Sequence, residues 1–416
     1  MFDLKRIKEE FSSCTCGVPH ELNIKDVVVE HGAKDKVGEI LRRNGFGKRL
    51  YLVADKNTLS ASDGILESLK DFTVTTRIYD NLREATVKES MSIAEELDGQ
   101  DGIIAVGTGS LHDISRYAAA KKDKPLCLFA TAPSMDGFAS YNAPLIDGNF
   151  KITYPAKSPE VIIADTKILA DSPAELKSAG FGDMVGKYVG LIDWQVSALL
   201  TGEYYCEKVA ALTRTATDRI MSLSERITEK DEESAKAVFE GLLLTGIGMS
   251  FTKTSRPASG TEHILSHFWE CKKLLNNELS DFHGKKVGVA TLLIMDLYGK
   301  LYELKSVKCK REVNDWEEIY SAYGELKNEV IKLNTPDTIT DGIDPRKIEE
   351  NWDKIRKIIA SVPKKEEIER AMLNAGCPTT CDKIGVSEEL KELGLKYHPY
   401  MRRRLSLRRI ANMIER

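Results

Sequence analysis

The sequence is poor in cysteine, in long apolar runs and in net charge, the features that mark disulfide-rich, membrane and nucleic-acid-binding proteins. Eight cysteines in 416 residues are too few for a disulfide scaffold. No apolar run is long enough to span a bilayer, and the charged start MFDLKRIKEEF (1–11) lacks the apolar core of a secretory signal. The net charge of −4 provides no overall field for nucleic acid or anionic membranes. We therefore expect a cytoplasmic protein with reduced thiols, no membrane span and no nucleic-acid partner.

The chain alternates two kinds of segment up to about residue 165. Aliphatic and β-branched runs read as strands: 26–32, 49–55, 72–80, 101–110, 125–134 and 160–169. Amphipathic stretches between them read as helices: 35–45, 59–72, 87–100 and 111–122. Strand alternating with helix predicts a mostly parallel sheet covered on both faces.

From about residue 170 the strand-like runs nearly vanish, and long helical stretches follow, such as 172–202, 235–251 and 285–308. The length also favours two domains. We predict an α/β nucleotide-binding domain over residues 1–168 and an all-helical domain over 169–416. The basic end YMRRRLSLRRIANMIER (400–416) reads as a packed terminal helix with solvated arginines, rather than as a nucleic-acid or membrane contact.

A phosphate-binding turn is a candidate in VGTGSLHD (106–113). Gly107 and Gly109 permit a tight turn after a strand, and free amides at a helix start favour phosphate. A simple turn is the alternative. Asp55 ends another strand, where a carboxylate can bind an adenosine ribose. Four polar residues follow a third strand, namely Thr131, Ser134, Asp136 and Ser140.

Two histidines, His263 and His267, lie four residues apart in GTEHILSHFWE (260–270) and so share a helical face. They are either surface or core histidines or part of a metal or proton-transfer site. With Asp183 and His283, His263 gives one carboxylate and two imidazoles, a set suited to a catalytic divalent ion. From the spacing alone, it is equally open that each of these residues has a separate structural role.

Two cysteine groups are candidates for metal sites. Cys14 and Cys16 lie close to His20, and Cys377 lies close to Cys381. The spacings differ from the C-x2-C pairs of zinc ribbons, so we interpret these thiols as structural or incidental.

Long motifs resemble a known family: TAPSMDGFASYNAPL (131–145), GFGDMVGKYVGLIDW (180–194), GTEHILSHFWE and HGKKVGVATLL (283–293). They are similar to the bacterial AraM-type sn-glycerol-1-phosphate dehydrogenases, within the iron-containing alcohol dehydrogenase and dehydroquinate synthase-like superfamily. The resemblance covers nearly the whole chain. It implies a homodimer with an active site between an α/β and a helical domain. It also implies reduction of dihydroxyacetone phosphate to sn-glycerol 1-phosphate, a step of phospholipid metabolism, with NAD(H) or NADP(H) and one divalent ion, zinc or nickel, with iron an option.

The resemblance also assigns residues. Asp183, His263 and His283 resemble the metal ligands, and Asp136, Asp183 and His267 resemble the substrate-binding and catalytic residues. The residues that resemble the dinucleotide site are Asp55, Gly107, Gly109, Ser110, Leu111, His112, Asp113, Thr131, Ala132, Pro133, Ser134 and Ser140.

Some points stay open. Thr108 replaces the middle glycine of the usual turn, which affects cofactor affinity. Asp55 would repel the 2′-phosphate of NADP, whereas Lys56 could compensate for that repulsion. Lys151 and Lys157 are candidates for the substrate phosphate, although surface lysines are the simpler interpretation. The alternatives to the dehydrogenase are a dehydroquinate synthase-like cyclase, a polyol (glycerol) dehydrogenase and a catalytically silent nucleotide-binding module.

Overall fold

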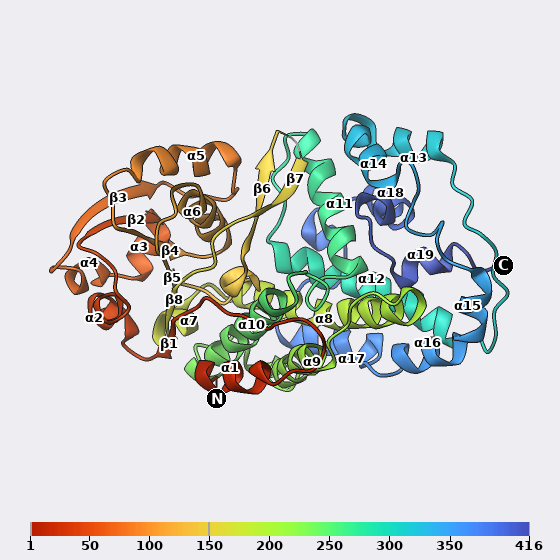
Figure 1. Cartoon of the computed structure of the whole chain (residues 1–416), viewed down its shortest axis with the longest axis horizontal. Coiled ribbons are helices and arrows are strands. Elements are labelled where there is room, and N and C mark those ends of the chain that lie inside the picture. Colours follow the sequence, from red (N-terminus) through yellow and green to blue (C-terminus); the bar gives the residue numbers. More distant parts are fainter. Residues whose placement is uncertain (1, 149, 416) are drawn as a thin grey trace.

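One six-stranded parallel sheet dominates the first part of the computed structural model, which describes residues 2–148 and 150–415 (Figure 1). Within these residues the sheet order is β1-β8-β5-β4-β2-β3. The strands are β1 Asp26–Glu30, β2 Arg49–Asp55, β3 Thr73–Tyr79, β4 Gly102–Gly107, β5 Leu126–Ala130 and β8 Val161–Asp165. All six predicted strands are confirmed.

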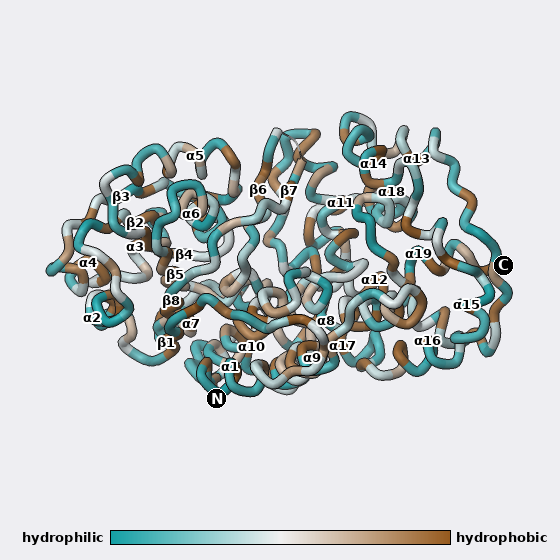
Figure 2. Tube along the Cα trace, in the orientation of Figure 1, coloured by the Kyte–Doolittle hydropathy of each residue, from teal (hydrophilic) through white to brown (hydrophobic). Residues whose placement is uncertain are grey.

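Helices cover both faces of this sheet, as predicted. The first part contains α1 Leu4–Ser12, α2 Val37–Arg43, α3 Lys56–Ala61, α4 Ile65–Ser68, α5 Val87–Glu96, α6 Gly109–Lys122 and α7 Thr166–Asp171. Alternate residues of β2 point to opposite sides: Leu52 packs with Ile40 of α2, and Val53 packs with Ile93 of α5. Peripheral helices such as α2 are mainly hydrophilic, whereas the inner segments are richer in apolar residues (Figure 2).

A two-stranded antiparallel hairpin, absent from the predictions, interrupts the α/β pattern. β6 (Asn142–Asp147) pairs with β7 (Phe150–Pro155), and the hairpin lies between the two halves of the molecule (Figure 1). Asp147 and Gly148, with alternating residues before them, are a hairpin signal that could have been recognised.

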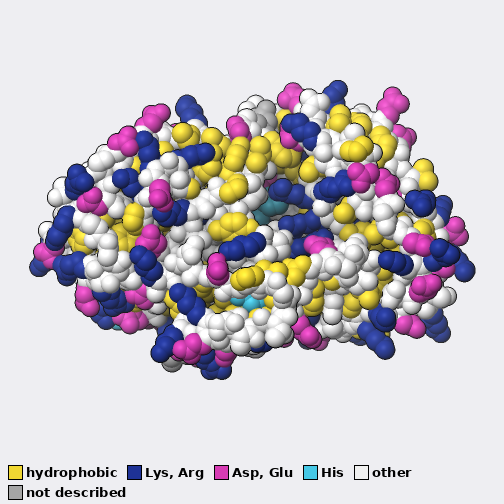
Figure 3. Space-filling model, viewed as in Figure 1, with side chains coloured by type: hydrophobic (Ala, Val, Ile, Leu, Met, Phe, Trp, Pro, Cys, Tyr) yellow, Lys and Arg dark blue, Asp and Glu magenta, His cyan; other side chains and the backbone are white. Residues whose placement is uncertain are grey.

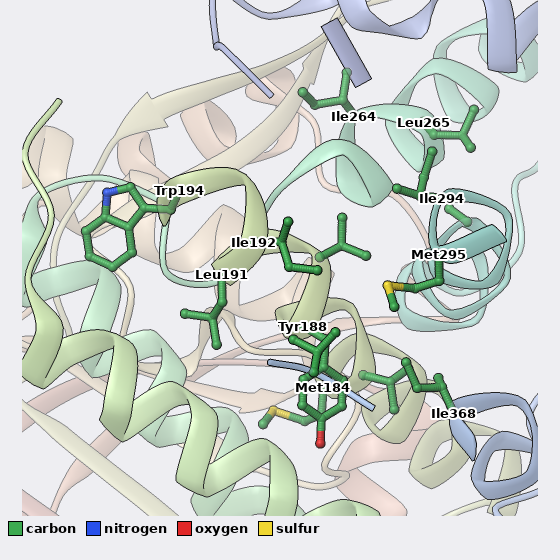
Figure 4. Close-up of a cluster of buried hydrophobic side chains, with 14 of the residues drawn as sticks. Met184, Tyr188, Leu191, Ile192, Trp194, Ile264, Leu265, Ile294, Met295 and Ile368 are labelled. Carbon is green, nitrogen blue, oxygen red and sulfur yellow. The ribbon is translucent and has the colours of Figure 1, made fainter. Parts of the chain in front are cut away.

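The remainder is helical, as predicted. Its helices are α8 Ala174–Thr201, α9 Glu207–Met221, α10 Glu232–Thr252, α11 Thr261–Leu275, α12 His283–Glu303, α13 Trp316–Tyr323, α14 Lys327–Asn334, α15 Pro345–Glu350, α16 Trp352–Ile359, α17 Lys365–Asn374, α18 Glu388–Tyr397 and α19 Leu407–Ala411. Side chains of α8, including Tyr188 and Ile192, meet Leu265 of α11 and Met295 of α12 in the main core (Figure 4). This core holds α11 and α12 against α8.

The N-terminal helix α1 packs on the helical part rather than on the sheet. Ile7 and Phe11 belong to the same core as α8–α10, and the Phe11 ring stacks on Phe251 with centroids 4.6 Å apart. The predicted domain division between residues 168 and 169 remains a prediction. Among the described residues, no helix combines the length and apolarity that crossing a bilayer requires.

The C-terminal prediction was only partly right. Met401, Leu405, Ile410 and Met413 are buried, as expected for a packed end. The segment is not one helix, however: a 3-10 turn (His398–Met401) and the short α19 flank an irregular stretch. Only some of its arginines are solvated, because Arg409 is fully buried and others reach the cleft described below.

Candidate active site

A cleft of about 600 Å³ lies between the carboxyl edge of the sheet, the hairpin β6–β7 and helices α11 and α12. Figure 3 shows the hollow between the two halves, with basic and histidine side chains on its floor. It contains the candidates from both halves of the sequence. Seven of the twelve predicted cofactor residues and two of the three predicted metal ligands line this cavity.

Asp183, His263 and His283 come together at one wall of this cleft: His263 and His283 line it, and Asp183 is fully buried behind them. Each offers one ligand atom, and these atoms all lie within 4.8 Å of one another. His263 Nε2 is 3.4 Å from Asp183 Oδ1. The three side chains come from α8, α11 and α12, so only the tertiary fold assembles the cluster.

Glycine allows α8 and α12 to approach closely enough to form the cluster. A Cβ added at Gly182 would lie 2.4 Å from the carbonyl oxygen of Gly284, and one added at Gly284 would lie 1.8 Å from that of Ala179. Both distances are far below van der Waals contact, so larger residues would push the helices apart. Asp183 and His283, the immediate neighbours of these glycines, are thereby brought within ligand distance.

In this cluster two carboxylates, those of Asp183 and Glu262, lie against the one imidazole of His263. Burial would raise the pKa of the Asp183 carboxyl, but the Lys187 ammonium and the two imidazoles hold it well below its usual range. His263 lies between two carboxylates, because its Nδ1 is 2.6 Å from Glu262 Oε1. Although burial lowers its pKa, these carboxylates raise the pKa of His263 to about 9. A divalent cation in place of the Nε2 proton would satisfy the same carboxylates.

The surroundings of the cluster are those of a metal site. The Glu262 carboxylate orients the His263 ring, a common arrangement behind metal-bound histidines. His283 has a buried Nδ1 without a hydrogen-bond partner among the described residues, and burial lowers its pKa well below the usual range. A neutral imidazole with a free nitrogen is the form that binds metals. The three residues thus fit a divalent ion.

Asp136 lies beside the cluster. Its backbone N–H donates to Asp183 Oδ2 at 2.9 Å, and its own Oδ2 is 2.6 Å from Lys187 Nζ. Burial and the neighbouring Asp183 raise the pKa of the Asp136 carboxyl. The residue therefore faces the cleft next to the metal candidates.

His267 also lines the cleft, one helical turn from His263. Its Nδ1 is 3.1 Å from Glu270 Oε2, and burial lowers the pKa of His267 to about 4. His267, Glu270 and His283 form a second group of ligand atoms within 4.8 Å, which gives a competing way to hold an ion.

The other end of the cleft lies where strand order reverses. From β2 the chain continues outward to β3 and then returns to form β4 on the opposite side of β2. Open α/β sheets bind ligands at such switch points. Several predicted cofactor residues line the cleft there: Asp55, Gly109, Ser110, Leu111, Asp113, Ser134 and Ser140. The start of α6 at Gly109 directs free backbone N–H groups into the same space.

Five predicted cofactor residues do not line the cleft: Gly107, His112, Thr131, Ala132 and Pro133. They lie beneath it. Thr131 N donates to Gly107 O at 3.0 Å, which braces the turn, and His112 is fully buried against the Phe138 ring. Of the five, Thr131 and Gly107 support the turn directly through this hydrogen bond.

Asp113 is buried at the cleft wall and contacts Arg116. The Arg116 Nη1 lies 3.1 Å from Asp113 Oδ1. Despite this pairing, burial raises the pKa of the Asp113 carboxyl to about 6. The charge of Asp113 therefore changes at pH values at which the protein can be studied.

Basic side chains also line the cleft, among them Lys151, which the sequence offered as a phosphate candidate, and four that it did not, Lys253, Lys286, Arg402 and Arg404. Lys151 and Lys286 share Glu270, with Nζ–Oε1 distances of 2.9 and 3.5 Å. Arg402 is paired with no carboxylate in the described part of the chain. Lys157, by contrast, is bonded to Asp123 at 2.6 Å and is not part of the cleft lining.

Comparisons with known proteins agree with this architecture. Residues 28–173 match the iron-containing alcohol dehydrogenase family. The chain is 31% identical over 390 residues to the glycerol-1-phosphate dehydrogenase of Geobacillus thermodenitrificans, covering 91% of this chain and 89% of that one. It is 29% identical to the Halalkalibacterium halodurans enzyme of the same name, covering 97% and 96%.

Solved structures show the same fold. An archaeal halo-thermophilic alcohol dehydrogenase from a Red Sea brine pool superposes with a TM-score of 0.63 at 15% identity, covering 94% of this chain and 96% of that one. The predicted fold class, an α/β domain followed by helices, is confirmed. The relatives and the shared fold together show that this chain belongs to the glycerol-1-phosphate dehydrogenase family of the iron-containing alcohol dehydrogenases.

Proposed function

We propose that this protein reduces dihydroxyacetone phosphate to sn-glycerol 1-phosphate with NADH or NADPH and one divalent metal ion. The observation that supports the proposal is the cleft. It is lined by His263 and His283, with Asp183 buried within ligand distance of both, and also by the carboxyl edge of the sheet and by several basic residues. The reaction needs these three features next to one another, because hydride donor, carbonyl and phosphate must all be aligned.

Asp183, His263 and His283 would hold the ion, which when bound polarises the substrate carbonyl. Two imidazoles and a carboxylate accept zinc, nickel or iron, and we propose zinc or nickel from the family resemblance. Glu262 keeps the His263 ring oriented, and Lys187 keeps Asp183 ionised.

The basic cluster gives a physical reason for a phosphorylated substrate. A phosphate brings two negative charges, and Arg402 and Arg404 offer guanidinium groups beside Lys286 at the end of the cleft. Burial lowers the pKa of Arg404 to about 9, so its side chain remains charged at neutral pH. Unphosphorylated glycerol would leave these buried charges uncompensated.

His267 is suited to binding a substrate hydroxyl. Since its ring is neutral and Nδ1 faces the Glu270 carboxylate, Nδ1 carries the hydrogen and Nε2 is an acceptor. Nε2 can then accept a hydrogen bond from a substrate O–H, and the proton that completes the new alcohol would come from water. Asp136, whose backbone N–H donates to Asp183 Oδ2, also lines the cleft and contributes a second polar wall.

The cofactor supplies the hydride, and the residues at its end of the cleft favour NADH. Asp55 presents a carboxylate to the position that an adenosine ribose would occupy. Lys56 could have compensated for the negative charge of a 2′-phosphate, but its ammonium group is instead paired with Asp80 at 2.5 Å. We therefore propose a preference for NADH over NADPH.

Three broader proposals remain: two domains divided at residue 168 and a cytoplasmic location, both from the sequence, and a homodimer, from the resemblance. Limited proteolysis, analytical ultracentrifugation and cell fractionation test them in turn.

The main test is an absorbance assay with NADH and dihydroxyacetone phosphate, run with and without a chelator, followed by chiral analysis of the product. Steady, chelator-sensitive NADH oxidation that yields sn-glycerol 1-phosphate is expected. A cyclase would oxidise no NADH in a steady state, and a glycerol dehydrogenase would prefer the unphosphorylated substrate. Protein that binds neither metal nor dinucleotide would support a silent module instead.

A further inference from the structure

A second group of metal-binding side chains lies away from the cleft. The segment between α1 and β1 supplies Cys14, Cys16 and His20, and Cys206 is the residue that precedes α9. Their ligand atoms all lie within 4.8 Å of one another. None of the four lines the cleft.

The distances within this cysteine–histidine cluster match a tetrahedral site. With Zn–S near 2.3 Å and Zn–N near 2.1 Å, tetrahedral geometry places two sulfurs about 3.8 Å apart and a sulfur about 3.6 Å from a nitrogen. Cys14 Sγ is 3.7 Å from Cys206 Sγ. His20 Nε2 is 3.5 Å from Cys206 Sγ and 3.2 Å from Cys16 Sγ. Three thiols and an imidazole at these separations form a complete ligand set with no open position.

The orientation of His20 supports the same conclusion. Its Nε2 faces the sulfurs, whereas its Nδ1 is 3.2 Å from the carbonyl oxygen of Phe251. A metal-bound histidine commonly donates its other ring N–H to a backbone carbonyl, which fixes the tautomer and the ring plane. The Tyr204 hydroxyl lies 3.2 Å from Cys16 Sγ and can donate a hydrogen bond to a metal-bound thiolate.

A disulfide explains the cluster less well. The Cys14 and Cys206 sulfurs are separated by 3.7 Å, whereas a disulfide bond is about 2.05 Å long. A disulfide would also leave Cys16 and His20 without a reason to face the same point. Incidental core thiols, the interpretation favoured from sequence alone, do not require a polar imidazole among them.

We propose that Cys14, Cys16, His20 and Cys206 hold a structural zinc ion, distinct from the ion in the cleft. The backbone turn at Gly17, with φ of 89°, allows Cys16 and His20 to face the same ion. The site ties the N-terminal segment to the start of α9 and, through His20, to the end of α10. Because Lys253 and Thr254 of the cleft wall follow α10 directly, the ion also steadies one side of the cleft.

Metal content of the purified full-length protein tests this proposal. Inductively coupled plasma mass spectrometry should find two metal ions per chain in the wild type and one in Cys206→Ser. His263→Ala should also retain one, and Cys206→Ser combined with His263→Ala should retain none. Cys309→Ser is the matched control, because Cys309 is a partly buried thiol outside the cluster, and it should retain two.

Cobalt substitution tests the site without a mutation that could impair folding. Wild-type protein refolded or reconstituted with Co²⁺ should show intense thiolate-to-cobalt charge-transfer absorption, and His263→Ala should retain it. Absence of that absorption in cobalt-loaded protein, or a Cys14–Cys206 disulfide found by mass spectrometry, would overturn the proposal. So would wild-type protein with a single ion that His263→Ala removes. Each outcome is independent of catalytic activity.

Discussion

His263 Nε2 lies 3.4 Å from Asp183 Oδ1, although the two side chains belong to different helices, α11 and α8. His267, on the same face of α11, contacts Glu270 instead. Two histidines four residues apart therefore have different surroundings. We propose that this difference makes His263 a metal ligand and His267 a substrate-binding residue.

Replacing these histidines should have different effects. His263→Ala should lose the cleft ion and lower kcat by about 10³-fold or more, since polarisation of the carbonyl is worth several kcal/mol. His267→Ala should retain the ion and mainly raise KM and lower kcat moderately. Metal analysis together with steady-state kinetics measures both. Equal loss of metal in the two variants would contradict the assignment.

Arg402 should matter for the phosphate. Arg402→Met removes a charged donor worth about 1.5–3 kcal/mol, so kcat/KM for dihydroxyacetone phosphate should fall roughly 10- to 100-fold, mostly through KM. Activity on unphosphorylated dihydroxyacetone should change little. The matched control is Arg403→Met, because Arg403 is exposed and bonded to Asp337. Equal effects of the two substitutions would place the phosphate elsewhere.

Asp55 should set the cofactor preference. Asp55→Asn retains an oxygen that can cap α3, where Asp55 Oδ1 accepts from Thr58 N, but removes the charge that would repel a 2′-phosphate. The ratio of kcat/KM for NADPH to that for NADH should rise about 10-fold, equivalent to ~1.4 kcal/mol. Asp63→Asn, an exposed carboxylate outside the cleft, should leave the ratio unchanged. An unchanged ratio in Asp55→Asn would place the adenosine ribose away from this strand end.

Asp113 should make stability depend on pH. Its folded pKa of about 6 is above the ordinary 3.8, so its contribution to stability is present below pH 4 and is lost as pH rises to about 6. The full loss is roughly 3 kcal/mol. Asp113→Asn should therefore gain stability relative to wild type as pH rises from 4 to 6, with little further gain above.

Denaturant unfolding across this pH range measures the effect. Asp98→Asn is a useful control, because Lys122 lowers the pKa of that exposed carboxyl, so any effect should have the opposite sign. A pH-independent difference between Asp113→Asn and wild type would show that the carboxyl has an ordinary pKa.

Local patterns predicted most of the fold. Runs such as RLYLVAD form strands because alternate side chains pack against the helices on opposite faces of the sheet, as Leu52 and Val53 do. The hairpin β6–β7 also had a local signal, at Asp147 and Gly148, but a short antiparallel insertion does not fit an alternating pattern. Sequence reasoning is strongest where periodicity alone decides the structure.

The site depended on contacts that no local pattern contains. Asp183 and His283 meet because glycines let two helices approach, and Arg402 reaches the cleft because the C-terminal stretch is irregular there. Cys206 joins the N-terminal cysteines from a remote segment. The pKa of His267 follows from burial, which spacing does not reveal. The family motifs supplied the ligand candidates, whereas the tertiary structure supplied their neighbours.

The most direct test of the central claim is an anomalous difference map from crystals of the wild-type protein with zinc or nickel, recorded at the absorption edge of the bound metal. The account predicts a peak in the cleft coordinated by Asp183, His263 and His283. A peak held instead by His267, Glu270 and His283, or no peak in the cleft of an active enzyme, would contradict it.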